Sequence, residues 1–282
     1  MKKILVTGAT GKVGRRFVPR LVRWEGADAV RILVRDETKA ADLAGLGVDV
    51  VQGDLREQAA RVKALQGVDA VVNVAAALRG VPDEEAYAVN RDAAVELGRD
   101  AAEAGVRRFV QTSTNLVYRG GLGRPAVESD ELRPDASWGA YAASKAQAEE
   151  ELRELELPLV VVRLAFVYGE GDTHLAQSLQ WAGQWASHQR LPVVHHADAS
   201  QSLWRAVRTP GIEGRAYNAV DDAPITAYDL HELHGVPQPE GAAAREAGDP
   251  WEGHASNARI RAELGWRPLY PSVWTARDAG AL

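Results

Sequence analysis

The chain has 282 residues, of which 46% are hydrophobic and 26% charged, and its formal net charge is −6. This composition is typical of a globular protein with one large domain or two interleaved ones. The acidic balance disfavours nucleic acids and anionic membranes as partners, and the absence of cysteine excludes disulfides, thiolate nucleophiles and cysteine metal ligands.

The apolar segments of the chain are short. Ile4–Val6 is shorter than the about 7–15 apolar residues of a secretory signal. The uncharged run Ala70–Leu78 is far below the roughly 20 residues that cross a bilayer. We therefore expect a cytoplasmic protein that does not bind a membrane.

Short apolar segments alternate with segments of helical spacing through the first 165 residues. Strands are expected over Lys3–Val6, Val30–Val34, Val48–Gln52, Ala70–Val74, Arg108–Thr112 and Leu159–Leu164. Helices are expected over Lys12–Trp24, Thr38–Leu43, Glu57–Leu65, Glu84–Ala104 and Trp138–Leu155. This alternation predicts an α/β fold of the Rossmann type, with a doubly wound parallel sheet and helices on both faces.

The composition and periodicity of the sequence change after Tyr168, where prolines and tryptophans become frequent and the helical stretches become short. We predict a dinucleotide-binding Rossmann domain over residues 1–168. Residues 169–282 are predicted to form mainly a smaller substrate-binding lobe. The apolar run at about 216–220 is predicted to return to the Rossmann sheet as a further strand.

A glycine-rich loop, Thr7–Gly14, lies between the first strand and the first helix. Gly8 permits a tight turn, Gly11 lets backbone amides approach a diphosphate, and Gly14 lets the helix pack closely on the strand. The free N–H groups at a helix start hold phosphate oxygens. Because a strand precedes the loop and a helix follows it, the loop predicts a dinucleotide site.

The residue that follows the second strand distinguishes NADP from NAD. Arg35 stands there, and an arginine accommodates the 2′-phosphate of NADP, with Lys12 and Arg15 adding positive charge nearby. In the alternative interpretation, Arg35 is a solvated surface residue and Asp36 binds the ribose of NAD. We expect NADP, with NAD as the alternative.

Two further patterns carry polar chemistry. Tyr141 and Lys145 have the i, i+4 spacing of one helical face, and a nearby cation lowers the pKa of a phenol from about 10. Tyr141 could then exchange a proton at neutral pH. Thr114 follows the fifth strand, where a hydroxyl faces the ligand crevice or merely caps the strand end. Asp54, after the third strand, is either an adenine contact or a helix N-cap.

Together these motifs make the chain resemble the extended short-chain dehydrogenase/reductase family, the NAD(P)-dependent epimerase/dehydratase group. The resemblance rests on Thr7–Gly14, Ser113–Tyr118 and Tyr141–Lys145. It continues in family order through Arg163–Gly169, Val194–Asp198, Ala216–Asn218 and Glu263–Pro268, and so covers nearly the whole chain.

The resemblance implies roles for these residues. Tyr141 is expected to be the acid–base, Lys145 to bind the nicotinamide ribose and lower the Tyr141 pKa, and Thr114, with Ser113 as the alternative, to be the catalytic hydroxyl. Val167 matches a position near the carboxamide. The expected cofactor-binding residues are Gly8, Thr10, Gly11, Lys12, Val13, Gly14, Arg35, Asp54, Leu55, Val74, Ala75, Ala76, Thr112, Tyr141, Lys145 and Val167.

Departures from the family pattern narrow the chemistry. Asn115 and Leu116 stand where the 4,6-dehydratases carry an Asp-Glu pair, so that elimination is not expected. Phe166 replaces an asparagine common in nucleotide-sugar enzymes, which disfavours sugar nucleotides. Trp138, Trp181 and Trp185 favour an apolar or aromatic substrate if they line the pocket rather than the core.

Histidine offers two weaker candidates. His231 and His234 lack a third ligand, so no metal site is expected. His195 and His196 alternate on an expected strand, which should turn one of them inward, where it either packs in the core or touches substrate.

We expect an NADP-preferring oxidoreductase that interconverts a small carbonyl compound and an alcohol. The alternatives are a nucleotide-sugar epimerase with retained NAD and a non-catalytic dinucleotide sensor. A homodimer is also expected, because family members commonly pair the helices that contain Glu84–Ala104 and Tyr141. The faces Val89/Ala93/Leu97 and Ala142/Ala146 fit such a dimer, but they fit packing within one chain equally well.

Overall fold

The computed structural model describes residues 2–78, 80–249 and 251–282. Its central element is a seven-stranded parallel sheet with the order β10-β6-β5-β4-β1-β2-β3. The strands are β1 (Ile4–Thr7), β2 (Val30–Val34), β3 (Asp49–Gln52), β4 (Ala70–Asn73), β5 (Arg108–Thr114), β6 (Leu159–Leu164) and β10 (Ala216–Ala219). The order reverses between β1 and β4, which is where a doubly wound sheet opens its ligand crevice.

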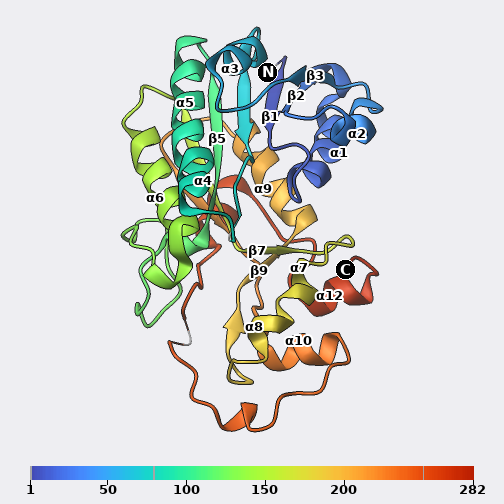
Figure 1. Ribbon diagram of the computed structural model, residues 1–282, viewed down its shortest axis with the longest axis vertical. Helices are drawn as coiled ribbons and strands as arrows, with labels where there is room; N and C mark the ends of the chain where they lie inside the picture. Colours follow the sequence, from blue (N-terminus) through green and yellow to red (C-terminus); the bar gives the residue numbers. More distant parts are fainter. Residues whose placement is uncertain (1, 79, 250) are drawn as a thin grey trace.

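Helices cover both faces of this sheet, as Figure 1 shows. One face carries α1 (Gly14–Glu25), α2 (Ala41–Ala44), α9 (His196–Arg208) and α11 (Ala258–Leu264). The other carries α3 (Gln58–Leu65), α5 (Ala93–Glu103) and α6 (Gly139–Arg153). The predicted α/β fold with a doubly wound parallel sheet is thus confirmed. In the described ranges no helix has the length and apolar character needed to cross a membrane.

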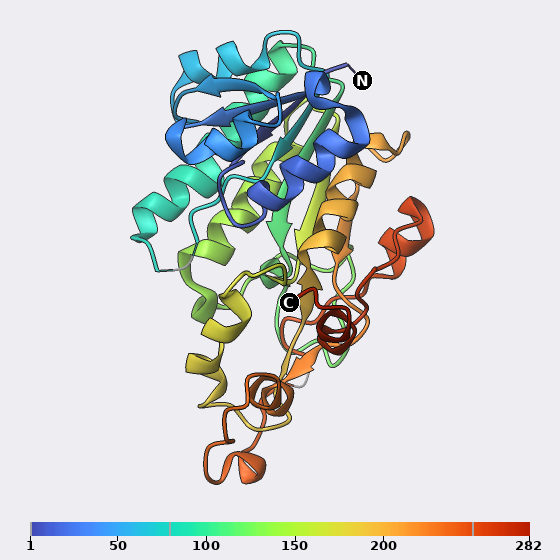
Figure 2. The same ribbon diagram turned by 90° about the vertical axis from the view of Figure 1, so that its right-hand side faces the viewer.

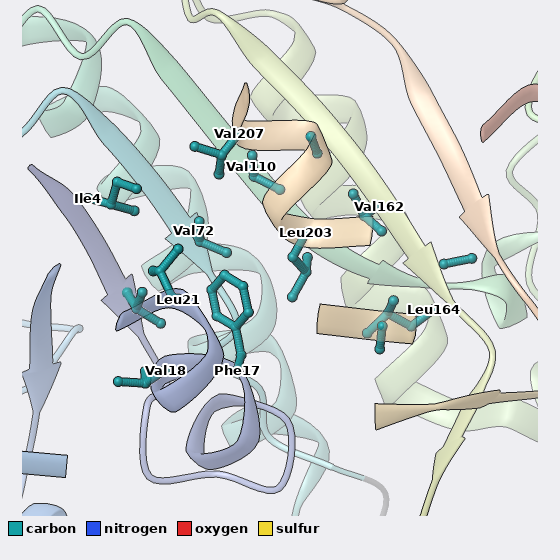
Figure 3. Close-up of a cluster of buried hydrophobic side chains, with 14 of the residues drawn as sticks. Ile4, Phe17, Val18, Leu21, Val72, Val110, Val162, Leu164, Leu203 and Val207 are labelled. Carbon is teal, nitrogen blue, oxygen red and sulfur yellow. The ribbon is translucent and has the colours of Figure 1, made fainter. Parts of the chain in front are cut away.

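The larger core lies between the sheet and the helices α1 and α9 (Figure 3). Phe17 and Leu21 of α1 and Leu203 of α9 pack against strand residues such as Val72 and Val110. Phe109, one position before Val110, belongs to the core on the opposite face, under α5 and α6. The strands are therefore apolar on both faces, as expected for a buried parallel sheet.

Several predicted boundaries shift. The fifth strand continues to Thr114, because Ser113 and Thr114 still pair with β6. Thr38–Leu43 begins as a 3₁₀ turn (Thr38–Ala40) before α2. The long helix predicted over Glu84–Ala104 consists of α4 (Asp83–Tyr87), a π-helical turn (Ala88–Asp92) and α5.

The π-helical turn contains the buried Asn90. Its side-chain amide bonds both the N–H and the carbonyl of Ala77, at 2.9 Å each, and donates to the Ser144 hydroxyl at 3.2 Å. The amide thereby satisfies the backbone of the loop after β4, which periodicity cannot predict.

After β6, much of the chain leaves the sheet and forms the smaller lobe, in the lower part of Figures 1 and 2. It contains α7 (His174–Gln177), α8 (Leu179–Ala182), α10 (Ala227–Leu233), α12 (Val273–Asp278) and the strand pairs β7 (Phe166–Tyr168) with β9 (Val193–His195) and β8 (Arg190–Leu191) with β11 (Ile225–Thr226). The segment around residues 216–220 forms β10 beside β6, and α9 and α11 also return to the sheet.

The apolar residues considered for a dimer are used within the chain. Leu97 and Ala142 are fully buried, and Ala93 and Ala146 nearly so. Val89 lines the cavity described below. These residues therefore give no support to a dimer, and the homodimer remains a prediction.

A buried ion pair fixes α6 on the sheet. Arg163 of β6 donates to Glu149 of α6 from Nη2 at 2.6 Å and from Nε at 3.0 Å, and both side chains are buried. Burial opposes the charge of Glu149, but Arg163 outweighs it and holds the pKa of this carboxyl below its usual value. Arg163 Nη1 also donates to the Tyr118 hydroxyl (2.5 Å), which donates to Asn218 of β10 (2.7 Å).

We predict that Glu149→Gln lowers the free energy of unfolding by about 3–5 kcal/mol, because it leaves the buried Arg163 guanidinium without a counter-charge. Urea unfolding followed by circular dichroism measures this change. Arg153→Ala is the matched control, because Arg153 contacts the same carboxylate at 2.8 Å from a partly exposed position, and it should cost about 0–1 kcal/mol. Equal effects of the two variants would contradict the prediction.

Candidate active site

A cavity of about 1050 Å³ runs along the carboxyl ends of the central strands and extends into the smaller lobe. Asp36, the alternative ribose ligand, does not line it, whereas every residue preferred for cofactor binding or catalysis does. From the glycine loop to the lobe these are Gly8, Thr10, Gly11, Lys12, Val13, Gly14, Arg35, Asp54, Leu55, Val74, Ala75, Ala76, Thr112, Thr114, Tyr141, Lys145 and Val167.

The glycine loop is shaped by close backbone approaches. Gly8 has φ +65°, and a Cβ there would lie 2.5 Å from the Ala75 nitrogen. A Cβ at Gly14 would lie 2.2 Å from the Gly8 carbonyl oxygen. Among the described residues the N–H groups of Lys12 and Val13 have no hydrogen-bond partner. These donors, at the N-terminus of α1, fit a diphosphate group.

The side chains after β2 divide into two roles. Asp36 Oδ1 accepts hydrogen bonds from the N–H (2.9 Å) and the hydroxyl (2.6 Å) of Thr38, and Asp36 is not part of the cavity wall. Arg35 is exposed, lines the cavity, and makes no ion pair within the described residues. The cation, rather than the carboxylate, is therefore available to a ligand at this end.

Asp54 is not a helix N-cap, because the N-cap of the helix that follows, α3, is Glu57. Its carboxylate accepts hydrogen bonds from the Arg56 backbone (2.9 Å) and guanidinium (2.6 Å). The Arg56 hydrogen bond lowers the pKa of Asp54. Both residues line the cavity, so this end presents Arg56 beside Arg35.

Lys12 and Arg15 were expected to add positive charge beside Arg35, but neither side chain is free on the cavity wall. Arg15 is exposed and does not line the cavity. Lys12 Nζ lies 2.9 Å from Asp172 Oδ1, in the loop after β7. Asp172 also contacts His196 Nε2 at 3.0 Å, and its side chain is almost fully buried. Lys12 therefore connects the glycine loop to the smaller lobe.

Lys145 is held at the base of the cavity. Its ammonium donates to the carbonyls of Thr112 (3.2 Å) and Ala75 (3.5 Å). Burial lowers the pKa of Lys145 to about 8, although the charge of Glu149 acts in the opposite direction. Tyr141, one turn earlier on α6, is half-buried on the cavity wall. A phenol beside a fixed cation can act as a proton donor or acceptor.

Thr114 and Ser113 both reach the cavity at the end of β5. Thr114 Oγ1 accepts a hydrogen bond from the Leu116 N–H at 3.3 Å, so it caps the short turn after the strand while lining the cavity. The capping and ligand-facing roles considered for Thr114 are thus compatible.

The lobe end of the cavity is mainly aromatic and apolar. Its wall includes Trp138, Phe166, Trp181, Trp185, Leu191 and Pro192, with Gln177, Gln180 and Gln189 between them. The three tryptophans thus line the cavity.

The histidine predictions need correction. The expected strand ends at His195, and His196 begins α9, so both rings are buried instead of alternating. Neither lines the cavity: His195 bonds Ala281 and His196 bonds Asp172. Among the described residues no cluster of three or more His, Asp or Glu side chains could hold a metal ion.

Sequence reasoning missed several polar cavity residues, among them Asp172 and His174. Both lie in the segment between β7, a strand of only three residues, and the start of α7. Polar residues after the end of a strand are the general signal of a site in a parallel sheet. The short β7 begins only two positions after the end of β6, so the apolar pattern of the sequence did not show it as a separate strand.

Comparison with known proteins agrees with this geometry. A family model described as NAD(P)H-binding matches residues 8–187. A 4-hydroxy-2-methyl-3-oxo-4-farnesyl-3,4-dihydroquinoline-1-oxide ketoreductase of Stigmatella aurantiaca is 29% identical over 96% of this chain and 83% of its own. A (4-alkanoyl-5-oxo-2,5-dihydrofuran-3-yl)methyl phosphate reductase of Streptomyces griseus is 32% identical over 86% of this chain and 70% of its own.

Among solved structures, a short-chain dehydrogenase/reductase superfamily protein from Agrobacterium tumefaciens with bound NAD has a TM-score of 0.78 and 24% identity, covering 98% of this chain and 95% of its own. That similarity shows the same fold. The family match and the 32% identical reductase show, in addition, that the chain is related in sequence to NAD(P)H-binding proteins. The chain therefore belongs to the NAD(P)H-binding family and has the fold of this short-chain dehydrogenase/reductase superfamily protein.

Proposed function

We propose that the chain is an NADPH-dependent reductase of a small carbonyl compound. One observation carries the proposal: Tyr141 stands one helical turn from Lys145, whose buried ammonium is fixed on the carbonyls of Thr112 and Ala75 at the cavity base. Burial of this charge is unfavourable for the fold. We therefore assign Lys145 a role in proton transfer at the phenol. The similar protein of Stigmatella aurantiaca, a ketoreductase by name, supports this proposal.

The roles of the chain's residues follow from their places. The glycine loop would hold the diphosphate, and Lys145 the nicotinamide ribose. When bound, a reduced nicotinamide supplies a hydride to a carbonyl carbon. Tyr141 then donates its proton to the carbonyl oxygen, while Thr114 orients that oxygen by a hydrogen bond. The Lys145 ammonium stabilises the resulting phenolate, which lowers the Tyr141 pKa.

The charges at the adenosine end favour NADP over NAD. Arg35 and Arg56 line that end, whereas Asp36 is engaged with Thr38 outside the wall. Asp54, a carboxylate on this part of the wall, is paired with Arg56 at 2.6 Å. Arg35 has no such partner among the described residues, and a guanidinium binds a 2′-phosphate through charge-assisted hydrogen bonds. At the other end, the three tryptophans favour an apolar or aromatic carbonyl compound.

Arg35→Ala tests the cofactor preference. Because a charge-assisted contact is lost, NADPH binding should weaken about 10- to 100-fold and NADH binding should change little. Quenching of tryptophan fluorescence measures both affinities. Arg15→Ala is the control, since Arg15 is exposed but off the cavity wall. A wild-type preference for NADH would refute the assignment.

Tyr141→Phe tests the proton donor. Turnover of an aromatic aldehyde, followed as loss of NADPH absorbance, should fall about 100- to 10,000-fold, the contribution of a positioned acid–base. NADPH affinity should stay within a few-fold, because only the phenolic oxygen is removed. Tyr228→Phe, at a side chain that is 53% exposed, should behave as wild type. Undiminished turnover in Tyr141→Phe would mean that another group supplies the proton.

The Lys145 pKa predicts a pH profile. Burial lowers this pKa from 10.5 to about 8, so the ammonium is present below pH 8 and is lost as the pH rises through that value. The ratio kcat/KM for NADPH, which reports the free enzyme, should therefore fall near pH 8 in the wild type. Lys145→Met should be slower at neutral pH and lack this step. The same step in both proteins would assign it to another group.

A further inference from the structure

His174 is an imidazole on the cavity wall that the proposed proton transfer does not use. It is the first residue of α7 and lies six positions after Tyr168, the last residue of β7. Its ring stacks on Phe166, with ring centroids 3.9 Å apart and an interplanar angle of 23°. Its backbone N–H donates to Asp172 Oδ1 at 3.0 Å. The ring is thus fixed in place between the two ends of the cavity.

The hydrogen bonds of His174 determine which nitrogen carries the proton. Nδ1 lies 3.3 Å from the carbonyl oxygen of Val167, which can only accept, so Nδ1 is the protonated nitrogen of the neutral ring. Nε2 then presents a lone pair. It has no hydrogen-bond partner among the described residues, and it is not one of the polar atoms sealed inside the protein. The lone pair is therefore accessible to a molecule in the cavity.

The surroundings keep this ring neutral. Burial lowers the pKa of His174, and the charges of Lys12 and His196 act in the same direction. The Val167 carbonyl and the Asp172 carboxylate oppose them but do not prevail. At neutral pH the ring consequently offers a hydrogen-bond acceptor rather than a positive charge.

We propose that His174 Nε2 is a specificity-determining acceptor for a hydroxyl group carried by the substrate, which makes the preferred substrates hydroxylated aromatic carbonyl compounds. This inference rests on the proposed reductase function. The amides of Gln177, Gln180 and Gln189 can pair with either donors or acceptors, so they do not make this distinction. An ether in place of the hydroxyl covers Nε2 without giving it a donor, and a polar group left buried and unpaired by the wrong ligand is what gives such sites their selectivity.

The test compares each hydroxy ketone with its methyl ether in the NADPH complex. The probes are α-hydroxyacetophenone with α-methoxyacetophenone, and para-hydroxyacetophenone with para-methoxyacetophenone. Wild-type protein should favour the hydroxy ketone of at least one pair by about tenfold in kcat/KM, the worth of one hydrogen bond to a neutral acceptor.

Two variants separate recognition from structure. Asparagine places its amide nitrogen near the position of Nδ1 and keeps the Val167 contact, but it has no atom at Nε2. Glutamine places its amide oxygen near Nε2 and loses the Val167 contact. His174→Asn should therefore reduce the preference to about one, and His174→Gln should keep it within about twofold of wild type. The reverse pattern would assign His174 a purely structural role and overturn the proposal.

Nitrogen NMR of histidine-labelled protein with bound NADP gives a readout independent of turnover. The His174 resonances, identified from their loss in His174→Gln, should show a protonated Nδ1 and a bare Nε2, and Nε2 should shift with a hydroxy ketone but not with its ether. A protonated Nε2, or no response to either hydroxy ketone, overturns the proposal. An Nε2 response without NADPH oxidation would instead refute the reductase function and leave this inference standing.

Discussion

The buried ion pair between Glu149 and Arg163 sets the orientation on which the site depends. Tyr141, Lys145 and Glu149 follow at intervals of four residues, so they form one stripe along α6. Arg163 of β6 holds the far end of this stripe against the sheet at 2.6 Å. The rotation of α6 is thereby fixed, and the near end of the stripe faces the cavity. A buried charge pair adds little net stability, but it fixes the orientation of a helix, because the two charges meet in only one register of α6 on the sheet.

A second contact joins the two halves of the chain across the cavity. Lys12 of the glycine loop and Asp172 of the lobe form an ion pair over 160 positions of sequence. Arg20 of α1 pairs with Glu170, two residues before Asp172, and Arg16 donates to the Glu170 carbonyl at 2.8 Å. The loop after β7 is therefore anchored to the helix that begins the diphosphate site. Residues that face the cofactor and residues that face the substrate consequently share one supporting framework.

The polar side chains under the cavity form a continuous row across the central strands. Thr7 donates to Asn73 at 2.5 Å, and Asn73 donates to Gln111 at 2.8 Å, so the carboxyl ends of β1 and β4 are linked to the middle of β5. Buried polar groups are tolerated when they satisfy one another. This row keeps the three strands in register. The loop of Ala75, after β4, lies against the glycine turn at Gly8, after β1. The carbonyls of Ala75 and of Thr112 in β5 accept hydrogen bonds from the Lys145 ammonium.

The sequence by itself determined the features that depend on local periodicity and on strand ends. The alternation of apolar runs and helical spacing predicted the doubly wound sheet, and the glycine loop, Arg35, Tyr141 and Lys145 were nominated from their places beside those elements. Their gathering in one cavity follows, because parallel strands bring their carboxyl ends to the same edge. Only the tertiary structure decided which partner each of these polar side chains contacts. Lys12 faces Asp172 rather than solvent, Asp36 turns to Thr38, and His195 and His196 are buried while His174 lines the cavity. Except for the contact of Asp36 with Thr38, which is local, these outcomes depend on contacts between distant segments, which no local pattern of residues records.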